Sequence, residues 1–151
     1  MEENSKKDIF EEKVIEIRRV SRTVKGGKRI SFRALVIVGD RNGQVGVGLG
    51  KGAEVALAIK KASNYAKKHL EQIKINDSGT ILREVTVGYD SAKVLLRPAP
   101  EGTSIIAGGV VRAVAELAGV RNLVTKSFGS NNKINIAMAT LNGLVEAGQN
   151  G

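Results

Sequence analysis

The length of 151 residues suits one medium domain or two small ones, and the 42% hydrophobic content is enough to build cores. The chain has 24 Lys or Arg and 15 Asp or Glu, a formal net charge of +9. The absence of Cys and the single His exclude disulfides, thiolate metal sites and cysteine nucleophiles, and argue against a metal, a cofactor or catalysis. Aromatic residues are too few, at 3%, to stack single-stranded bases, and no apolar run nears the roughly 18 residues of a membrane span, so we expect a cytoplasmic protein.

The first half of the chain has the periodicity of three strands and a helix. The first strand places Ile15 and Ile17 on one face, opposite charged neighbours. The second and third strands are joined at Asp40–Gly43, a hairpin signal because Asn and Gly tolerate the positive φ of a tight turn. The expected elements are strands at Val14–Val20, Arg29–Gly39 and Gln44–Lys51 and a helix at Ala53–Lys74.

The glycines of the third expected strand are open to two interpretations. Gly48, Gly50 and Ala53 fit a relaxed dinucleotide-binding fingerprint, which would make the protein a nucleotide-dependent enzyme. That fingerprint requires a parallel strand–helix–strand unit, whereas the strand here follows an antiparallel hairpin. The favoured interpretation is that the glycines clear side chains from one face of the sheet so that another backbone can come close.

The second half of the chain follows a polar, turn-forming segment at Asn76–Gly79, where we expect a module boundary. Its expected elements are strands from near Leu82 to Val87, at Lys93–Arg97 and at Asn122–Phe128, a helix after Gly109 that ends at Gly119, and a helix at Asn132–Ala147. The order βββα followed by ββαβα predicts an α+β protein with modules at residues 8–75 and 79–151. The segment Glu101–Gly109 is either an anion site or an ordinary helix start.

Positive charge is concentrated in the first half. Residues 1–75 hold 17 basic and 9 acidic residues, a net charge of +8, whereas residues 76–151 hold 7 and 6, a net charge of +1. The densest cluster surrounds Gly26 and Gly27 in an expected loop between two strands, where backbone amides can also approach phosphates. We therefore expect this loop to bind a phosphate backbone, the alternative being a solvated charged loop. Its cations are Arg18, Arg19, Arg22, Lys25, Lys28 and Arg29.

Four segments, in order and with matching spacing, resemble the bacterial small-subunit ribosomal protein S-five family. They are Val20–Arg29, Val38–Gly46, Glu101–Gly109 and Phe128–Asn132. The resemblance covers nearly the whole chain. It implies an N-terminal module like a double-stranded-RNA-binding domain, a C-terminal module with helices packed on a sheet, and a structural role in the small ribosomal subunit without enzymatic activity.

The resemblance also implies partners. Relatives bind small-subunit ribosomal RNA (rRNA) where head, neck and body meet, beside ribosomal proteins S-four and S-eight, and add unassigned cations to the channel through which messenger RNA enters. Their basic loop points to the neck near the spectinomycin site, and their contact with S-four influences decoding accuracy. Gly108 and Arg112 lie in the segment that corresponds to the S-four contact. The expected rRNA-binding residues are Arg18, Arg19, Ser21, Arg22, Lys25, Gly26, Gly27, Lys28, Arg29 and Lys51.

Overall fold

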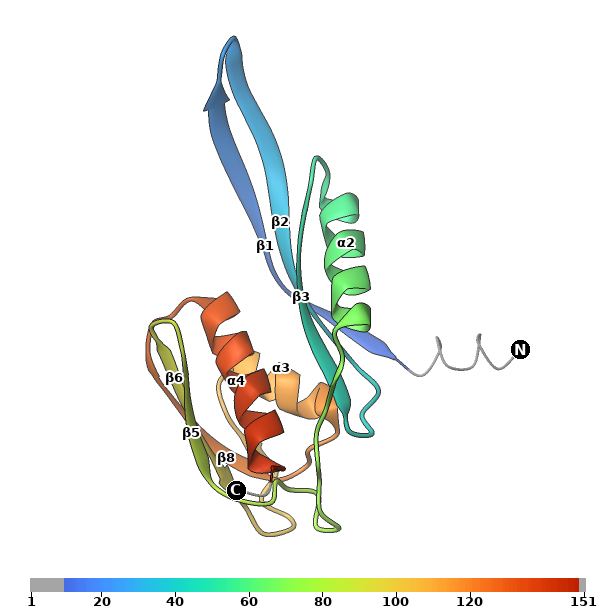
Figure 1. Ribbon diagram of the computed structural model, residues 1–151, viewed down its shortest axis with the longest axis vertical. Coiled ribbons are helices and arrows are strands. Elements are labelled where there is room, and N and C mark those ends of the chain that lie inside the picture. Colours follow the sequence, from blue (N-terminus) through green and yellow to red (C-terminus); the bar gives the residue numbers. More distant parts are fainter. Residues whose placement is uncertain (1–9, 150–151) are drawn as a thin grey trace, which may run out of the picture.

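The computed structural model describes residues 10–149, which form four layers: a helix, a sheet, two helices and a second sheet (Figure 1). The elements are β1 Glu11–Val24, β2 Gly27–Gly39, β3 Gln44–Gly52, α2 Val55–Lys68, β4 Glu71–Gln72, β5 Val85–Tyr89, β6 Ala92–Pro98, β7 Ile105–Ile106, α3 Gly109–Ala118, β8 Leu123–Gly129 and α4 Lys133–Ala147. The expected α+β plan is confirmed, with β4 and β7 as additions. The outer limits expected for the two modules, residues 8 and 151, lie outside the described range.

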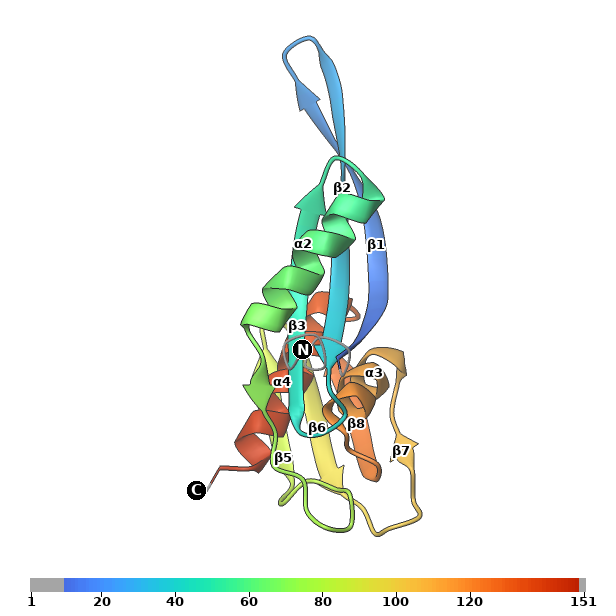
Figure 2. The same cartoon turned by 90° about the vertical axis from the view of Figure 1, so that its right-hand side faces the viewer.

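The first sheet has the antiparallel order β1-β2-β3-β4, and α2 lies across one of its faces (Figure 2). The small core under α2 consists of Ala34, Val36, Val38, Ala58, Ala62 and Ala66. Glu12 on β1 is tied to the same helix, because Ser63 Oγ donates to its Oε1 at 2.5 Å and Lys67 Nζ lies 2.9 Å from that atom. Both interactions favour the ionised carboxylate and lower the pKa of Glu12.

The glycines of β3 lie against the backbone of α2. A Cβ atom added to Gly48 would overlap the carbonyl oxygen of Ala62, and one added to Gly50 would overlap the backbone of Ala58. This confirms the expected close approach of another backbone. The nucleotide-binding interpretation is wrong, because β3 is antiparallel to β2 and the helix fills the glycine face.

The other face of the first sheet packs on α3 and α4. Leu35 and Ile37 of β2 belong to the same buried cluster as Val114 of α3 and Leu141 of α4. The connection between β2 and β3 is bonded to the end of α3, since the amides of Arg41 and Gly43 donate to Leu117 O and Ala118 O at 2.9 and 2.8 Å. The two halves of the chain therefore share one hydrophobic core.

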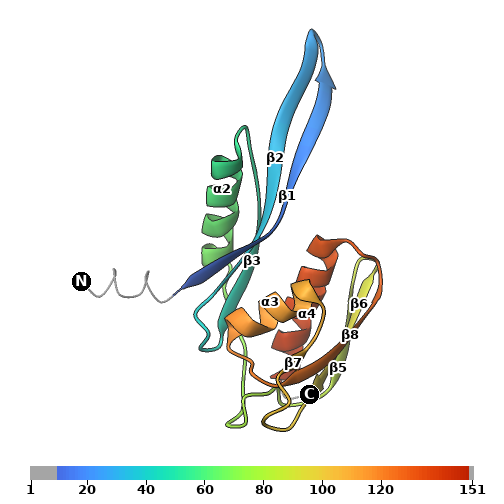
Figure 3. The ribbon, with the colours of Figure 1, turned by 180° about the vertical axis from the view of Figure 1, so that it is seen from behind.

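The second sheet has the order β5-β6-β8-β7, in which β7 runs parallel to β8 and the other pairs are antiparallel. Figure 3 shows α3 and α4 on one side of this sheet, between it and β3. Helix α3 ends at Gly119, as expected, with a left-handed φ of 100°. Helix α4 begins after Asn132, whose side chain accepts hydrogen bonds from the amides of Ile134 and Asn135.

Three features of the first module differ from those expected. The basic stretch is strand rather than loop, because β1 continues to Val24 and β2 begins at Gly27. A register shift between Val14 and Glu16 breaks the alternation of β1, so that Ile15 packs on the main core while Ile17 is exposed. The helix ends at Lys68 instead of residue 74, since the chain turns at His69 and adds β4 to the edge of β3.

Candidate nucleic-acid interface

The β1–β2 hairpin extends past the end of α2 (Figure 1) and carries most of the expected site residues. Opposite residues of an antiparallel pair lie on the same face of the sheet. Arg18 lies opposite Arg33, Arg22 lies opposite Arg29, and Arg33 also lies opposite Lys51 of β3. These five residues form one strip across three strands, which we call the cationic face: Arg18, Arg22, Arg29, Arg33 and Lys51.

The cationic face consists of like charges in direct opposition, an arrangement that destabilises a sheet. Arg18 is paired with Glu16, at 3.3 Å between Nε and Oε1. The other four cations have no acidic partner within residues 10–149. All but Arg33 are exposed. Unneutralised, closely spaced cations of this kind create a positive potential that attracts anions.

A cavity of about 590 Å³ lies beside the cationic face, where β3 ends and the chain turns into α2. Its walls include three residues of the face, Arg22, Arg29 and Lys51, from three different strands. Lys61 of α2 adds a fourth cation. The sequence analysis predicts Arg22, Arg29 and Lys51 as site residues, and the structure brings them together around one cavity.

The remaining expected RNA-binding residues lie on the other face or in the turn of the hairpin. Arg19, Ser21 and Lys28 are on the face that points to the α2 side, since Arg19 lies opposite Phe32, which packs on the core beneath α2. Lys25 and Gly26 form the turn, and Gly26 and Gly27 have φ angles of 99° and 148°. Cations therefore surround the distal hairpin on both faces.

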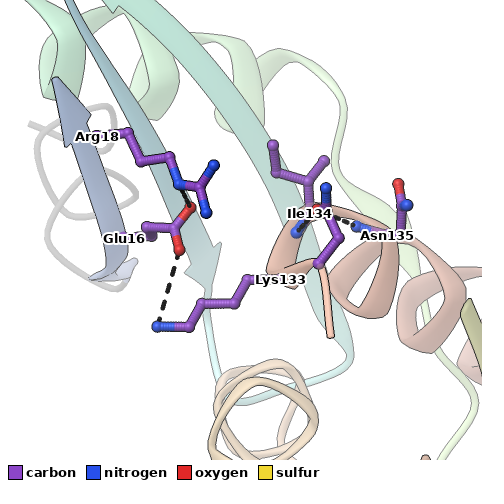
Figure 4. A network of polar contacts seen from close by, with 6 residues as sticks. Glu16, Arg18, Lys133, Ile134 and Asn135 are labelled. Atoms are coloured by element: carbon purple, nitrogen blue, oxygen red, sulfur yellow. Dashed lines mark hydrogen bonds and ion pairs between the residues drawn. The ribbon is translucent and has the colours of Figure 1, made fainter. Parts of the chain in front are cut away.

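Glu16 lies at the base of the cationic face and connects the two halves of the chain (Figure 4). Its Oε1 accepts from Arg18, and its Oε2 lies 3.8 Å from Lys133 Nζ at the start of α4. The capped helix start places Lys133 there. This network is partly exposed, with the Arg18 and Lys133 side chains in solvent, so its effect is on the orientation of Arg18 and Lys133 more than on stability.

The two residues expected at a protein interface lie together at the start of α3. Gly108 precedes the helix, and Arg112 is exposed one turn later, with its Nε 2.9 Å from Glu116 Oε1. Arg112 points outward, as expected, and is also engaged by a residue of its own helix. The amides of Gly102 and Ser104 donate to Asn122 Oδ1 at 3.1 and 3.0 Å, so the preceding loop uses those groups internally.

Comparison with known proteins identifies the family. Residues 10–74 match the family described as "Ribosomal protein S5, N-terminal domain", and residues 87–148 match "Ribosomal protein S5, C-terminal domain". The chain is 56% identical over 135 residues to the small ribosomal subunit protein uS5 of Thermotoga petrophila, which covers 89% of this chain and 75% of the relative. The chain belongs to the ribosomal protein S5 (S-five) family.

Other S5 relatives are similar over the same length. The uS5c protein of Cyanophora paradoxa is 50% identical over 92% of this chain and 82% of its own, and the uS5 protein of Ureaplasma urealyticum is 52% identical over 91% and 68%. The family confirms the resemblance read from the four sequence segments. The protein is a structural constituent of the small ribosomal subunit and not an enzyme.

Sequence reasoning missed two cations of the candidate interface, Arg33 and Lys61. Arg33 lies at the period-two spacing from Arg29 and Ser31, so strand alternation could have placed it on the same face. Lys61 could not be found in this way, because its proximity to the hairpin depends on how α2 lies across the sheet. Within residues 10–149 no helix is long and apolar enough to cross a membrane.

Proposed function

We propose that this S5 chain binds small-subunit rRNA with its first module, residues 8–75, and ribosomal proteins with its second, residues 79–151. The observation that supports RNA binding is the cationic face. Its positive charges lie directly opposite one another on neighbouring strands, and its acidic neighbour, Glu16, is paired with Arg18 at one end of the face. A polyanion that lies along this face relieves the repulsion between its arginines.

The mechanism is phosphate neutralisation combined with fit to folded RNA. Arginine presents a planar fork of donors that matches two phosphate oxygens, and the face presents four such forks on adjacent strands. Each neutralised phosphate releases counterions, which makes affinity fall with salt. Contacts of this type fix register and orientation on RNA more than they read bases.

The cations on both faces of the distal hairpin suit insertion between RNA elements rather than docking on one. Arg19, Ser21 and Lys28 then contact one RNA surface while Arg22 and Arg29 contact the other. The glycines of the turn, with their positive φ angles, keep the tip narrow. In this proposal the tip reaches the neck near the spectinomycin site, as in relatives.

The second module faces the proteins S-four and S-eight. The net charge of residues 76–151, only +1, gives little attraction for a polyanion. Arg112 is exposed beside Gly108 at the start of α3, the segment proposed for the S-four contact. Because the modules share a core, we expect a displacement of α3 to shift β2 and β3 as well. This coupling is how a protein contact would influence decoding accuracy. Messenger RNA in its channel is a further proposed partner, without assigned residues.

Titration of the full chain with a small-subunit rRNA fragment at several salt concentrations tests the proposal. If the five cations of the face each neutralise one phosphate, the slope of log K against log salt is about −4. No ATP hydrolysis is expected under the same conditions, because the glycine face of β3 is filled by α2 and offers no nucleotide site. Weak RNA binding that does not depend on salt would contradict the proposed function.

A further inference from the structure

We propose that the cavity beside the cationic face holds a single unstacked nucleotide of the bound RNA. The inference rests on the proposed RNA binding and adds to it, because phosphates alone can be neutralised on a flat surface and need no cavity. The class of ligand is a nucleotide extruded from a helix, with its phosphate and its base contacting different walls.

The fold builds this cavity at the corner of the first sheet. Pairing between β2 and β3 stops at Phe32 and Gly52, so the stretch of β2 from Gly27 to Ser31 pairs with β1 alone. The chain leaves the sheet at Gly52, where a Cβ atom would meet Leu57 Cβ and Ala58 N at 2.9 Å, and enters α2. The missing stretch of a third strand leaves the space.

The walls of the cavity combine apolar and positively charged groups, which suit the base and the phosphate of a nucleotide. Val20 and Ile30 line the cavity with apolar atoms, and Ile30 is 41% exposed although it is a large aliphatic residue. Arg22, Arg29, Lys51 and Lys61 supply four positive charges with no acidic partner within the described part of the chain. The volume, about 590 Å³, lies within the range of sites that enclose small molecules.

The arginines can serve the base as well as the phosphate. A guanidinium plane stacks on an unpaired base in the way an aromatic ring does, and an aliphatic side chain can cover the other side of the base. Lys51 and Lys61 come from β3 and α2 and act as point charges for the flanking phosphates. A base held in this way is recognised because it is extruded from the helix, and not by which of the four bases it is.

Two RNA hairpins with identical stems, one carrying a single-nucleotide bulge, test this inference with the full chain. The wild type should bind the bulged RNA about tenfold more tightly, because stacking on one base has an effect of that order. Ile30→Ser and Val20→Ser should each reduce this preference to less than about threefold and leave the affinity for the plain stem and its salt slope unchanged. The matched control is Ile17→Ser, an equally exposed residue at 43% that does not line the cavity, and it should keep the full preference.

The outcomes separate this inference from the proposed function. Equal affinity of the wild type for the two RNAs, or a preference that survives both Ile30→Ser and Val20→Ser, overturns the nucleotide site and leaves RNA binding by the cationic face in place. Binding to neither RNA overturns both. Adenosine monophosphate should displace the bulged RNA at lower concentration than inorganic phosphate does, and equal displacement would show an anion site only and overturn the inference.

Discussion

Strand β2 passes through two environments. Comparing them separates the residues that pack within the chain from those on the candidate RNA-binding surface. Its second half, Ala34–Gly39, is buried between α2 on one face and the α3–α4 layer on the other. Its first half, Gly27–Ile30, is exposed beyond the end of the core. Apolar residues occupy both faces of the buried half, whereas the exposed half pairs Arg29 with Arg22.

From this difference we infer that the two halves of β2 interact with different partners. The buried half is determined by packing within the chain, so substitutions there should change stability. The exposed half carries like-charge pairs, which weaken a sheet, and in our proposal the RNA phosphate backbone compensates for this repulsion. Substitutions there should change binding with little effect on stability.

The largest effect is expected from Gly48→Ala in the buried part of the first sheet. The added Cβ would overlap Ala62 O, and a helix backbone cannot shift as a flexible side chain can. We expect a loss of at least about 3 kcal/mol in the free energy of unfolding, measured by urea denaturation. Gly88→Ala is the control, since a Cβ there has its nearest neighbour at 3.6 Å. Equal stability of the two variants would contradict the packing described for α2.

Gly27→Val should have a smaller effect on stability and a larger one on function. The φ of 148° is strained for valine, and nothing lies within 4 Å of an added Cβ, so the change is conformational and confined to the turn. We expect a loss of about 1 kcal/mol and an altered spectinomycin response in cells. Thr23→Val, on a regular strand position of the same hairpin, should leave both unchanged. A normal drug response with Gly27→Val would count against the role of the tip.

The pH dependence of stability should show a contribution from Glu12. Ser63 and Lys67 lower its folded pKa, so the stabilisation is present above the ordinary Glu pKa of about 4.3 and is lost as pH falls through the folded value. Glu12→Gln should lower the thermal midpoint at pH 7, and the difference from the wild type should shrink as the pH falls through the folded pKa of Glu12. The effect should stay below about 1 kcal/mol because the pair is partly exposed. A difference that stays constant as the pH is lowered would assign the effect to packing.

The smallest effect on stability is expected from Arg112→Leu on α3, below about 0.5 kcal/mol, since it removes one exposed ion pair. Its effect should appear in misreading rates of ribosomes that contain the variant. Glu116→Gln breaks the same ion pair and keeps Arg112, so misreading should stay normal. If both variants changed misreading equally, the ion pair rather than an interface would be responsible.

Periodicity predicted the buried half of β2 and the glycine contact with α2, because both depend on residues that alternate along one strand. It did not predict that β1 and β2 continue through the basic stretch. Polar residues on both faces give no alternation there, and the register depends on the shift at Ile15. Strand β4 was missed because its two residues pair only after the chain turns at His69.

The sequence predicted which residues belong to the candidate site but not how those residues are arranged in space. Ten RNA-binding residues were named from one charged stretch and Lys51, and the structure divides them between two faces and a turn. The cavity depends on where β3 leaves β2 and on the position of Lys61 of α2. Neither can be read from spacing along the chain.

The most direct test of the central claim compares two pairs of substitutions in the full chain that each remove two positive charges. Arg22→Gln with Arg29→Gln removes the like-charge pair of the cationic face, and Lys93→Gln with Lys126→Gln removes two exposed cations from the second sheet. In a salt titration with an rRNA fragment, the first variant should reduce the slope of log K against log salt by about 1.6 and leave thermal stability equal or higher. The second variant should match the wild type. Equal loss of affinity in the two variants would contradict RNA recognition by the cationic face.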